Sequence, residues 1–416
     1  MSDLHEYIRA MAAGAKRASI GLRSLGTGAK NVALDSIAAS IEGRRGEIAA
    51  ANARDVDRGR KAGLSAAMID RLTLSDRRID EMITSLKEIA AFEDPVGEVT
   101  GTRRPAGFVL EKVRTPIGVI VMIYESRPNV TLDAAALCLK SGNAAILRGG
   151  SEAAESSKAI VESIRRGLGT AGVDGNAVQY VERPEYEAID LLVTQSGLVD
   201  LVVPRGGEAL IRRIAEKATV PVIKHYKGVC HLYVDETADL GMAAEVVANS
   251  KLQRPGTCNA LEQLLVHEAV APRFLPMVRE KMPKVELRGD ERTRAILPGT
   301  RPATEEDWCT EYLDLVLAVK VVGSLEEAAA RIERFGSSHT DGICSRDAGN
   351  IERFVGMVDS AVVTVNASTR LNDGAIFGLG AELGISTDKL HARGPMGLRE
   401  LTTFKWVLRG NGNLRE

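Results

Sequence analysis

The run Gly118-Val119-Ile120-Val121-Met122-Ile123-Tyr124 decides the fold class of this chain. It is apolar throughout, whereas a strand with one face in water alternates apolar and polar residues. A uniformly apolar strand is typical of a parallel sheet that is covered by helices on both faces. Strand-like and helix-like segments then alternate, with strands expected at 143–148, 177–181 and 199–203 and helices at 152–168, 186–195 and 208–218. This alternation predicts βαβ units and a doubly wound parallel sheet.

The segments on either side of this sheet extend the α/β prediction. Residues 3–93 carry apolar side chains at helical spacing and are expected to form helices that end at Asp94-Pro95. A half-polar strand at 108–114 is a candidate arm that pairs outside its own domain, and 401–408 is a candidate closing strand. A second strand-helix alternation, from 261 to 366, predicts a second α/β domain. The glycine-rich stretch 372–395 is expected to be a long, ordered functional loop.

Size and charge narrow the class of protein. With 416 residues the chain is too long for one ordinary core, so two or more domains are expected. Its net charge of −2 and the lack of a long basic tract give no indication of a nucleic-acid or membrane-surface partner. No apolar run approaches the roughly 20 residues that span a bilayer. The first 15 residues contain no hydrophobic signal core, so a cytoplasmic protein is expected.

The five cysteines and six histidines are scattered along the sequence. The cysteines are odd in number and never spaced as C-x-x-C, and no H-E-x-x-H motif occurs. Neither a disulfide framework nor a metal site is therefore expected.

One cysteine, Cys258, has the setting of a nucleophile. It lies in the stretch 249–260, on a short loop with Pro255 and Gly256, between a helical run and the strand expected at 261–266. Such a loop exposes a nucleophile rather than packing it. Thr257 and Asn259 make the surroundings polar, which can favour the thiolate. The alternative is that Cys258 is one more small buried residue, as most unpaired cysteines are.

The ends of the predicted strands supply further candidates. Arg148-Gly149-Gly150-Ser151 follows one strand and Gly206-Gly207 follows another, each just before a helix. Small residues at such turns let backbone N–H groups face a phosphate, and two turns on one sheet predict a nucleotide site. G-x-G-x-x-G and G-x-x-x-x-G-K-[ST] are both missing, which argues against an ordinary Rossmann dehydrogenase and against a P-loop kinase.

Each of four single residues has two interpretations, one with a role in the reaction or in binding and one without. Asn129 could donate to an oxyanion or be a loop or near-cap residue. Glu311 could accept hydrogen bonds from ribose or be a surface acid. His339 and His391 could bind an anionic substrate or be exposed loop histidines.

Several of these motifs together resemble the aldehyde dehydrogenase superfamily and, more narrowly, the gamma-glutamyl phosphate reductase family. The resemblance covers essentially the whole chain, and the last motif is specific to the narrower family. The motifs are Tyr124-Glu125-Ser126-Arg127-Pro128-Asn129-Val130, Gln253-Arg254-Pro255 ahead of Cys258-Asn259-Ala260, Trp308 with Thr310-Glu311-Tyr312-Leu313, and Leu390-His391-Ala392-Arg393-Gly394-Pro395-Met396-Gly397.

The resemblance implies two doubly wound α/β domains with a β-hairpin oligomerisation arm. A cofactor domain would comprise 1–99 and 118–236, a catalytic domain 237–385, and the arm 100–117 and 395–416. It also implies a homo-oligomer and a partnership with glutamate 5-kinase, which makes the labile acyl phosphate. The length leaves no room for a fused kinase, so none is expected.

The resemblance also implies a reaction, the second step of proline biosynthesis. L-Glutamyl 5-phosphate would be reduced by NADPH to L-glutamate 5-semialdehyde and phosphate, the reverse of a phosphorylating semialdehyde dehydrogenase. Cys258 would form a thioester, and Asn129 with the Cys258 backbone N–H would form the oxyanion hole. Arg127 and Arg254 are the candidate ligands for the substrate anions.

Two departures from the wider superfamily refine this reaction. Hydrolytic members carry a general-base Glu where this chain has Lys224-His225-Tyr226-Lys227-Gly228, which would spare the thioester from water. Members that prefer NAD often place an acid where Ser151 stands, so Ser151 with Arg148 favours NADP. The alternatives are a hydrolytic aldehyde dehydrogenase for another semialdehyde and a non-catalytic binding protein on the same scaffold.

Overall fold

The computed structural model describes residues 3–103, 107–125 and 127–415, and the chain divides into two compact units. The first unit comprises the chain up to Lys224 together with Gly378–Gly384 and Met396–Glu416. The second comprises His225–Phe377 and Ile385–Pro395. In the described ranges, no helix is long and apolar enough to cross a membrane.

The first unit begins with five helices, as the spacing of apolar residues predicts. Ser65 and Ser75 cap two of them, each accepting a hydrogen bond from the backbone N–H three residues later. Gly167 lets α7 lie directly against α2, because a Cβ there would meet the backbone of Ile37. The helices are α1 (Asp3–Leu22), α2 (Thr27–Gly43), α3 (Arg45–Lys61), α4 (Ala66–Leu72) and α5 (Asp76–Ala91).

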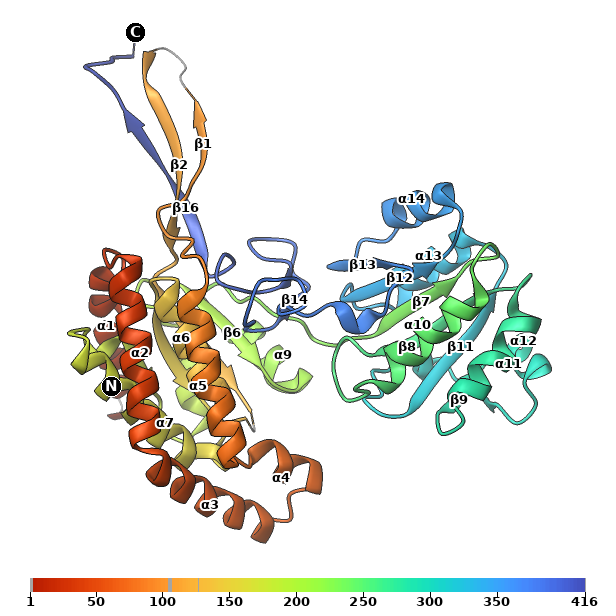
Figure 1. The fold of residues 1–416 in the computed structure, drawn as a ribbon, viewed down its shortest axis with the longest axis horizontal. Coiled ribbons are helices and arrows are strands. Elements are labelled where there is room, and N and C mark those ends of the chain that lie inside the picture. The colour runs from red at the N-terminus through yellow and green to blue at the C-terminus, as the bar shows by residue number, and fades with distance from the viewer. Residues whose placement is uncertain (1–2, 104–106, 126, 416) are drawn as a thin grey trace. The chain divides into compact units, whose positions relative to one another are not determined.

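A parallel sheet of four strands forms the centre of the first unit, in the order β5-β4-β3-β6 (Figure 1). Every residue of β3 is buried, which confirms the prediction from its uniform apolarity. From β3 the chain adds β4 and β5 on one side of this strand and then returns to add β6 on its other side. The loops that follow β3, β4 and β6 leave the carboxyl ends of neighbouring parallel strands, so they meet at one edge of the sheet. The strands are β3 (Val119–Tyr124), β4 (Ala144–Arg148), β5 (Val178–Tyr180) and β6 (Leu201–Arg205), and they alternate with α6 (Asn129–Lys140), η2 (Ser151–Ala153), α7 (Ala154–Thr170), η3 (Gly175–Ala177), α8 (Tyr186–Leu192) and α9 (Glu208–Lys217).

The second unit is built on a seven-stranded parallel sheet in the order β10-β9-β11-β8-β7-β12-β13. Two separate apolar clusters cover its two faces, one with α10 and α11 and the other with α13 and α14. Its strands are β7 (Cys230–Val234), β8 (Leu261–His267), β9 (Glu286–Gly289), β10 (Arg301–Pro302), β11 (Val316–Val322), β12 (Thr340–Cys344) and β13 (Val362–Val365). Its helices are α10 (Leu240–Leu252), α11 (Ala271–Lys281), α12 (Glu291–Ile296), η4 (Glu306–Cys309), α13 (Leu325–Phe335), α14 (Ala348–Met357) and η5 (Thr369–Leu371).

The division between the units falls after Lys224, whereas the sequence-based boundary stands at 236/237. The physical reason is the position of β7, which pairs with β8 and β12 and is therefore part of the second sheet.

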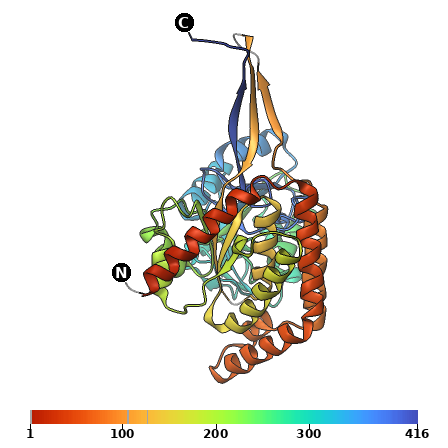
Figure 2. The same ribbon diagram turned by 90° about the vertical axis from the view of Figure 1, so that its left-hand side faces the viewer.

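A third, antiparallel sheet in the order β1-β2-β16 extends from the first unit as a ribbon (Figures 1 and 2). It joins β1 (Val99–Arg103) and β2 (Val109–Pro116) to β16 (Thr402–Arg409), so the two candidate strands at 108–114 and 401–408 pair with each other. Residues 104–106 of the predicted arm lie outside the described residues. In the second unit, β14 (Ile385–Ser386) pairs with β15 (Gly394–Pro395) inside the predicted glycine-rich loop.

Candidate active site

Cys258 lies on the irregular loop between α10 and β8 and is partly exposed. The backbone of Cys258 packs closely against Gly228 and Cys230. A Cβ added at Gly228 would lie only 1.8 Å from the Cys258 carbonyl oxygen, so only glycine permits this approach. The buried Cys230 thiol donates to the same oxygen at 3.2 Å. Asn259 anchors the far side of the loop by donating to the carbonyl of Asn372.

The other cysteines differ from Cys258 in environment. Cys138, Cys230 and Cys344 are buried. Burial raises the pKa of Cys138 and of Cys344 to about 12, and raises the pKa of Cys230 well above its usual range. Cys309 is exposed on η4. Among the five cysteines, Cys258 is therefore the one that is partly exposed and lies on the loop between a helix, α10, and a strand of the sheet, β8.

Two histidines come close to Cys258, from distant parts of the sequence. One ring nitrogen of His225, one of His339 and the Cys258 Sγ all lie within 4.8 Å of one another. The two rings pack edge to face with centroids 5.4 Å apart. His339, predicted as a possible exposed loop residue, is instead fully buried beside β12. His391 lies on the loop between β14 and β15, with a left-handed φ of 70°.

Two arginines place positive charge near Cys258. Arg254 is exposed on the same loop. Arg370, on η5, donates from Nε to Gln253 Oε1 at 2.9 Å. Burial lowers the pKa of Arg370, the charge of Arg254 lowers it further, and the charges of Asp373 and Cys258 raise it. Arg370 is thus a site residue that the sequence did not single out, because no motif surrounds it.

Glu311, the candidate ribose ligand, contacts Gly228, the residue that packs against Cys258. Its Oε1 accepts the backbone N–H of Gly228 at 3.0 Å. Nearby, the fully buried Lys251 and Glu262 form an ion pair at 2.7 Å, and Glu262 also accepts the N–H of Leu313. Burial raises the pKa of Glu262 to about 7, against the opposing effect of Lys251.

The first unit holds the other predicted residues. Gly149, Gly150 and Ser151 follow β4, and Gly206 and Gly207 follow β6 and precede α9. The Gly207 N–H donates to the Glu125 carboxylate at 2.9 Å, so this turn already presents an amide to an anion. Among the described residues, no heavy atom beyond its chain neighbours lies within 4 Å of the position of a Gly207 Cβ, which leaves room for a ligand.

Arg148 is buried, and its guanidinium donates to the carbonyls of Gly149 at 2.5 Å and Pro184 at 3.0 Å. Within the described ranges, no acceptor pairs with its buried Nε–H, a donor that a phosphate oxygen would satisfy. The Glu152 carboxylate folds back over Gly150, where a Cβ would meet it. An acid therefore does stand beside this turn, one residue after Ser151. A carboxylate thus lies against the glycines at both turns, Glu152 at Gly150 and Glu125 at Gly206 and Gly207.

Asn129 is the first residue of α6, and Arg127 is exposed in the turn before it. The Asn129 side-chain amide donates to Asp133 at 3.3 Å, one turn further along the helix. Burial raises the pKa of Asp133 to about 6, partly offset by hydrogen bonds from Ser85 and Asn129. Ser126, which belongs to the same motif, lies outside the described residues.

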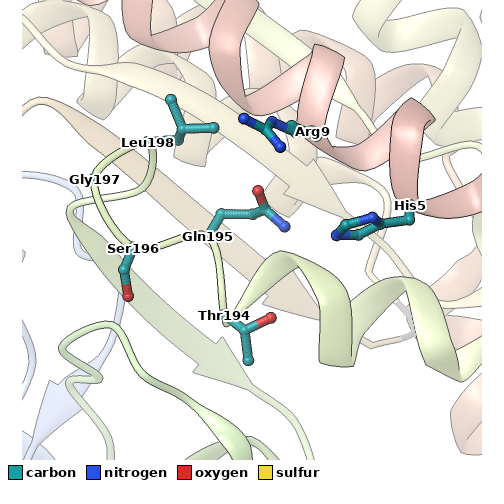
Figure 3. Close-up of a pocket in the computed structure, with 7 residues that line it drawn as sticks. All are labelled: His5, Arg9, Thr194, Gln195, Ser196, Gly197 and Leu198. Atoms are coloured by element: carbon teal, nitrogen blue, oxygen red, sulfur yellow. The ribbon is translucent and has the colours of Figure 1, made fainter. Parts of the chain in front are cut away.

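A surface hollow of the first unit lies apart from these residues in the sequence and contains none of them. His5 and Arg9 of α1 line it on one side, and residues 194–198 line it on the other (Figure 3). The side chains of His5 and Gln195 point toward each other across it (Figure 3).

Comparison with known proteins places this geometry in a family. Residues 2–300 match the model of the aldehyde dehydrogenase family. Gamma-glutamyl phosphate reductase from Geotalea daltonii is 51% identical over 414 residues, covering 99% of each chain, and that from Moorella thermoacetica is 52% identical over 405 residues, covering 97% of each. The chain belongs to the aldehyde dehydrogenase family. Within it, this is a member of the gamma-glutamyl phosphate reductases, which confirms the resemblance read from the motifs.

Solved structures agree with this assignment. Gamma-glutamyl phosphate reductase from Thermotoga maritima has a TM-score of 0.97 and 46% identity, covering 98% of this chain and all of that one. An acetylating aldehyde dehydrogenase from Geobacillus thermoglucosidasius has a TM-score of 0.70 at 17% identity and shares the fold alone. The predicted aldehyde dehydrogenase fold is therefore confirmed.

Against this family background, the predicted site residues form two sets. Cys258, Arg254 and Glu311 lie in the second unit, and the glycine turns, Arg148, Arg127 and Asn129 lie in the first. His225, His339 and Arg370 join the second set and were not predicted as neighbours of Cys258. Their sequence positions carried no spacing signal, because β7, β8 and β12 bring them together only through long-range pairing.

Proposed function

We propose that this chain catalyses the NADPH-dependent reduction of L-glutamyl 5-phosphate to L-glutamate 5-semialdehyde and phosphate, the second step of proline biosynthesis. The observation that carries the proposal is the setting of Cys258, a partly exposed thiol on a tightly held loop with Arg254 and Arg370 nearby. Close relatives named for this activity support it.

The first step forms an acyl-enzyme. The Cys258 thiolate attacks the acyl carbon, the bond from that carbon to the phosphate oxygen breaks, and phosphate leaves. The positive charges of Arg254 and Arg370 favour the thiolate and attract the phosphate of the substrate. Arg127 is the further candidate for a substrate anion.

The second step reduces the thioester. The nicotinamide cofactor, when bound, would supply the hydride. The side-chain amide of Asn129 and the Cys258 backbone N–H donate to the oxyanion of the resulting thiohemiacetal, and removal of one such donor typically costs about 10²–10³ in rate. The carbon–sulfur bond then breaks, which releases the aldehyde and regenerates the Cys258 thiolate.

The chain's residues also provide for the cofactor. The turns at Gly149-Gly150-Ser151 and Gly206-Gly207 would hold its phosphates on their backbone N–H groups, and Glu311 would accept from a ribose hydroxyl. Arg148 favours the 2′-phosphate of NADPH, whereas the Glu152 carboxylate opposes it. A comparison of kcat/KM for NADPH and NADH measures which charge dominates, and a preference for NADPH is expected.

A homo-oligomeric, cytoplasmic enzyme is part of the same proposal. The sheet β1-β2-β16 would form the oligomerisation arm, because Phe404, Trp406 and Leu408 alternate along β16 and are all exposed. Glutamate 5-kinase, which makes the labile substrate, is the proposed partner in acyl-phosphate transfer.

The reverse reaction tests the function. NADPH formation from glutamate semialdehyde and NADP⁺ is followed with and without phosphate, for the wild type, Cys258→Ala and Cys309→Ser. Formation that requires phosphate, is lost in Cys258→Ala and persists in Cys309→Ser is expected. Formation that is independent of phosphate would instead support the hydrolytic alternative, and lack of nicotinamide nucleotide binding would support a non-catalytic role.

A further inference from the structure

The cluster around Cys258 has the composition of a site for a soft metal ion. Its ligand atoms are one thiol sulfur and two imidazole nitrogens, all within 4.8 Å of one another. All three residues belong to the second unit, which brings them together from the segment before β7, the loop before β8 and the position just before β12. Thiolate and imidazole ligands select Zn²⁺ and similar ions over Mg²⁺ and Ca²⁺, which prefer oxygen.

One of the two histidines is held as metal-binding histidines usually are. His339 is fully buried, and its Nδ1 lies 2.7 Å from Thr340 Oγ1. An outer hydrogen bond of this kind fixes the orientation of an imidazole, and the Thr340 hydroxyl can accept a proton held on Nδ1. A proton on Nδ1 places the lone pair on Nε2, which is the nitrogen that would bind the ion. Cys258 and His225 are only partly buried, so their side chains can adjust to an ion that His339 holds.

The distances are close to those that a tetrahedral ion needs. Zn–S bonds of about 2.3 Å and Zn–N bonds of about 2.0–2.1 Å place tetrahedral ligand atoms roughly 3.3–3.6 Å apart. The ligand atoms of the cluster are at most 4.8 Å apart, so they must approach by no more than about 1.5 Å. The movement required falls to Cys258 and His225, whose side chains are only partly buried.

We propose that Cys258, His225 and His339 bind a thiophilic divalent cation, Zn²⁺ above all, and that its binding reversibly withholds the Cys258 sulfur from the reaction. The thiol proton passes to solvent as the sulfur–metal bond forms. Three protein ligands leave the fourth position to water or an anion. Arg254 and Arg370 weaken the binding of the cation by repulsion and attract an anion to the fourth position.

Binding of the metal does not depend on the proposed function, but inhibition does, since it requires that Cys258 be the nucleophile. The two are therefore measured separately. Co²⁺ is titrated into the reduced, full-length protein without substrate or cofactor, and the thiolate-to-cobalt charge-transfer band and the visible bands of tetrahedral Co²⁺ are recorded. Zn²⁺ affinity is obtained from displacement of Co²⁺, with Mg²⁺ as the oxygen-preferring control.

The variants are Cys258→Ser, His225→Ala and, as a matched control, Cys309→Ser, which removes an exposed thiol outside the cluster. The wild type and Cys309→Ser should show the charge-transfer band, and Cys258→Ser should not. His225→Ala should weaken Zn²⁺ binding by at least about 100-fold, because even outer hydrogen-bond partners of metal ligands contribute 10–100-fold. Zn²⁺ should inhibit NADPH turnover, and a chelator should restore it.

A wild-type titration without a thiolate band, or a His225→Ala variant that binds Zn²⁺ as tightly as the wild type, would overturn the proposed site. Activity of the metal-depleted wild type reports on the proposed function alone. A metal site that fails this test therefore leaves the proposed function standing, and a chain that binds Co²⁺ through Cys258 but reduces no acyl phosphate would retain the site without the function.

Discussion

Replacement of Gly228 by alanine should disable the enzyme while leaving it folded. Gly228 has no left-handed φ, so alanine is compatible with its backbone conformation. The obstacle is space. The new Cβ would lie 1.8 Å from the carbonyl oxygen of Cys258, 2.6 Å from its carbonyl carbon and 2.8 Å from its Cα. All three are backbone atoms, so no side-chain rotation relieves the overlap.

The expected size of the effect follows from these distances. Real Cβ atoms essentially never come within 3.0 Å of another heavy atom, so the two segments must separate by about 1.2 Å. A misplacement of about 1 Å in an active site can cost 10²-fold in rate. Gly228→Ala should therefore lower kcat about 100-fold or more, which corresponds to about 2.7 kcal/mol in the activation barrier. Overpacking should also lower the stability by about 1–3 kcal/mol.

The assay is phosphate-dependent NADPH formation, with the rate of Cys258 alkylation and the melting temperature measured on the same samples. Gly356→Ala is the matched control, because Gly356 lies in α14 of the same unit and its Cβ would meet no atom of the described part of the chain within 4 Å. It should keep full activity and gain about 0.5–1 kcal/mol of stability. If Gly228→Ala is folded and its kcat stays within threefold of the wild type, the close approach does not position Cys258.

Four further outcomes are expected. Glu311→Ala should lower kcat and slow Cys258 alkylation if the carboxylate positions Gly228, whereas a rise confined to the KM of the cofactor would mean that it acts only on ribose. Lys251→Met should cost about 3–5 kcal/mol in thermal or denaturant unfolding, because it leaves the buried Glu262 without its partner, and adding Glu262→Leu should recover much of the loss. The pKa of Asp133 is raised to about 6 by burial, so its protonated form stabilises the fold below about pH 4 and this contribution is lost as the pH rises through 6. The melting temperature of Asp133→Asn should thus rise relative to that of the wild type as the pH increases from 4 to 7. A difference between the two melting temperatures that does not change with pH would refute this. Trp406→Lys should reduce the oligomeric mass measured by light scattering if the exposed face of β16 is an interface, and an unchanged mass would exclude that face.

The fold was predictable where local sequence determines local structure. The apolar run of β3 identified a buried parallel strand, and the helical spacing before Asp94 identified the first helices. That β7 joins the sheet of the second unit was not predictable, because the residues of a strand do not determine which sheet it pairs with. β9 was not predictable because it is short and only alternate residues are buried, a pattern that turns also show.

The candidate site divides in the same way. Cys258 and the glycine turns were identifiable because each belongs to a short loop whose character depends on residues adjacent in the sequence. That His225, His339 and Arg370 lie near Cys258 was not predictable, because each reaches it through tertiary contacts between distant segments.

The contacts beneath Cys258 explain why those distant segments matter for its chemistry. The Gly228 backbone is fixed from one side by Glu311 and presses against the Cys258 carbonyl on the other, while the Cys230 thiol donates to that same carbonyl. The nucleophile's position is therefore set by residues that take no part in the proposed attack. These long-range contacts hold the Cys258 backbone in a fixed position, which attack by its thiolate requires.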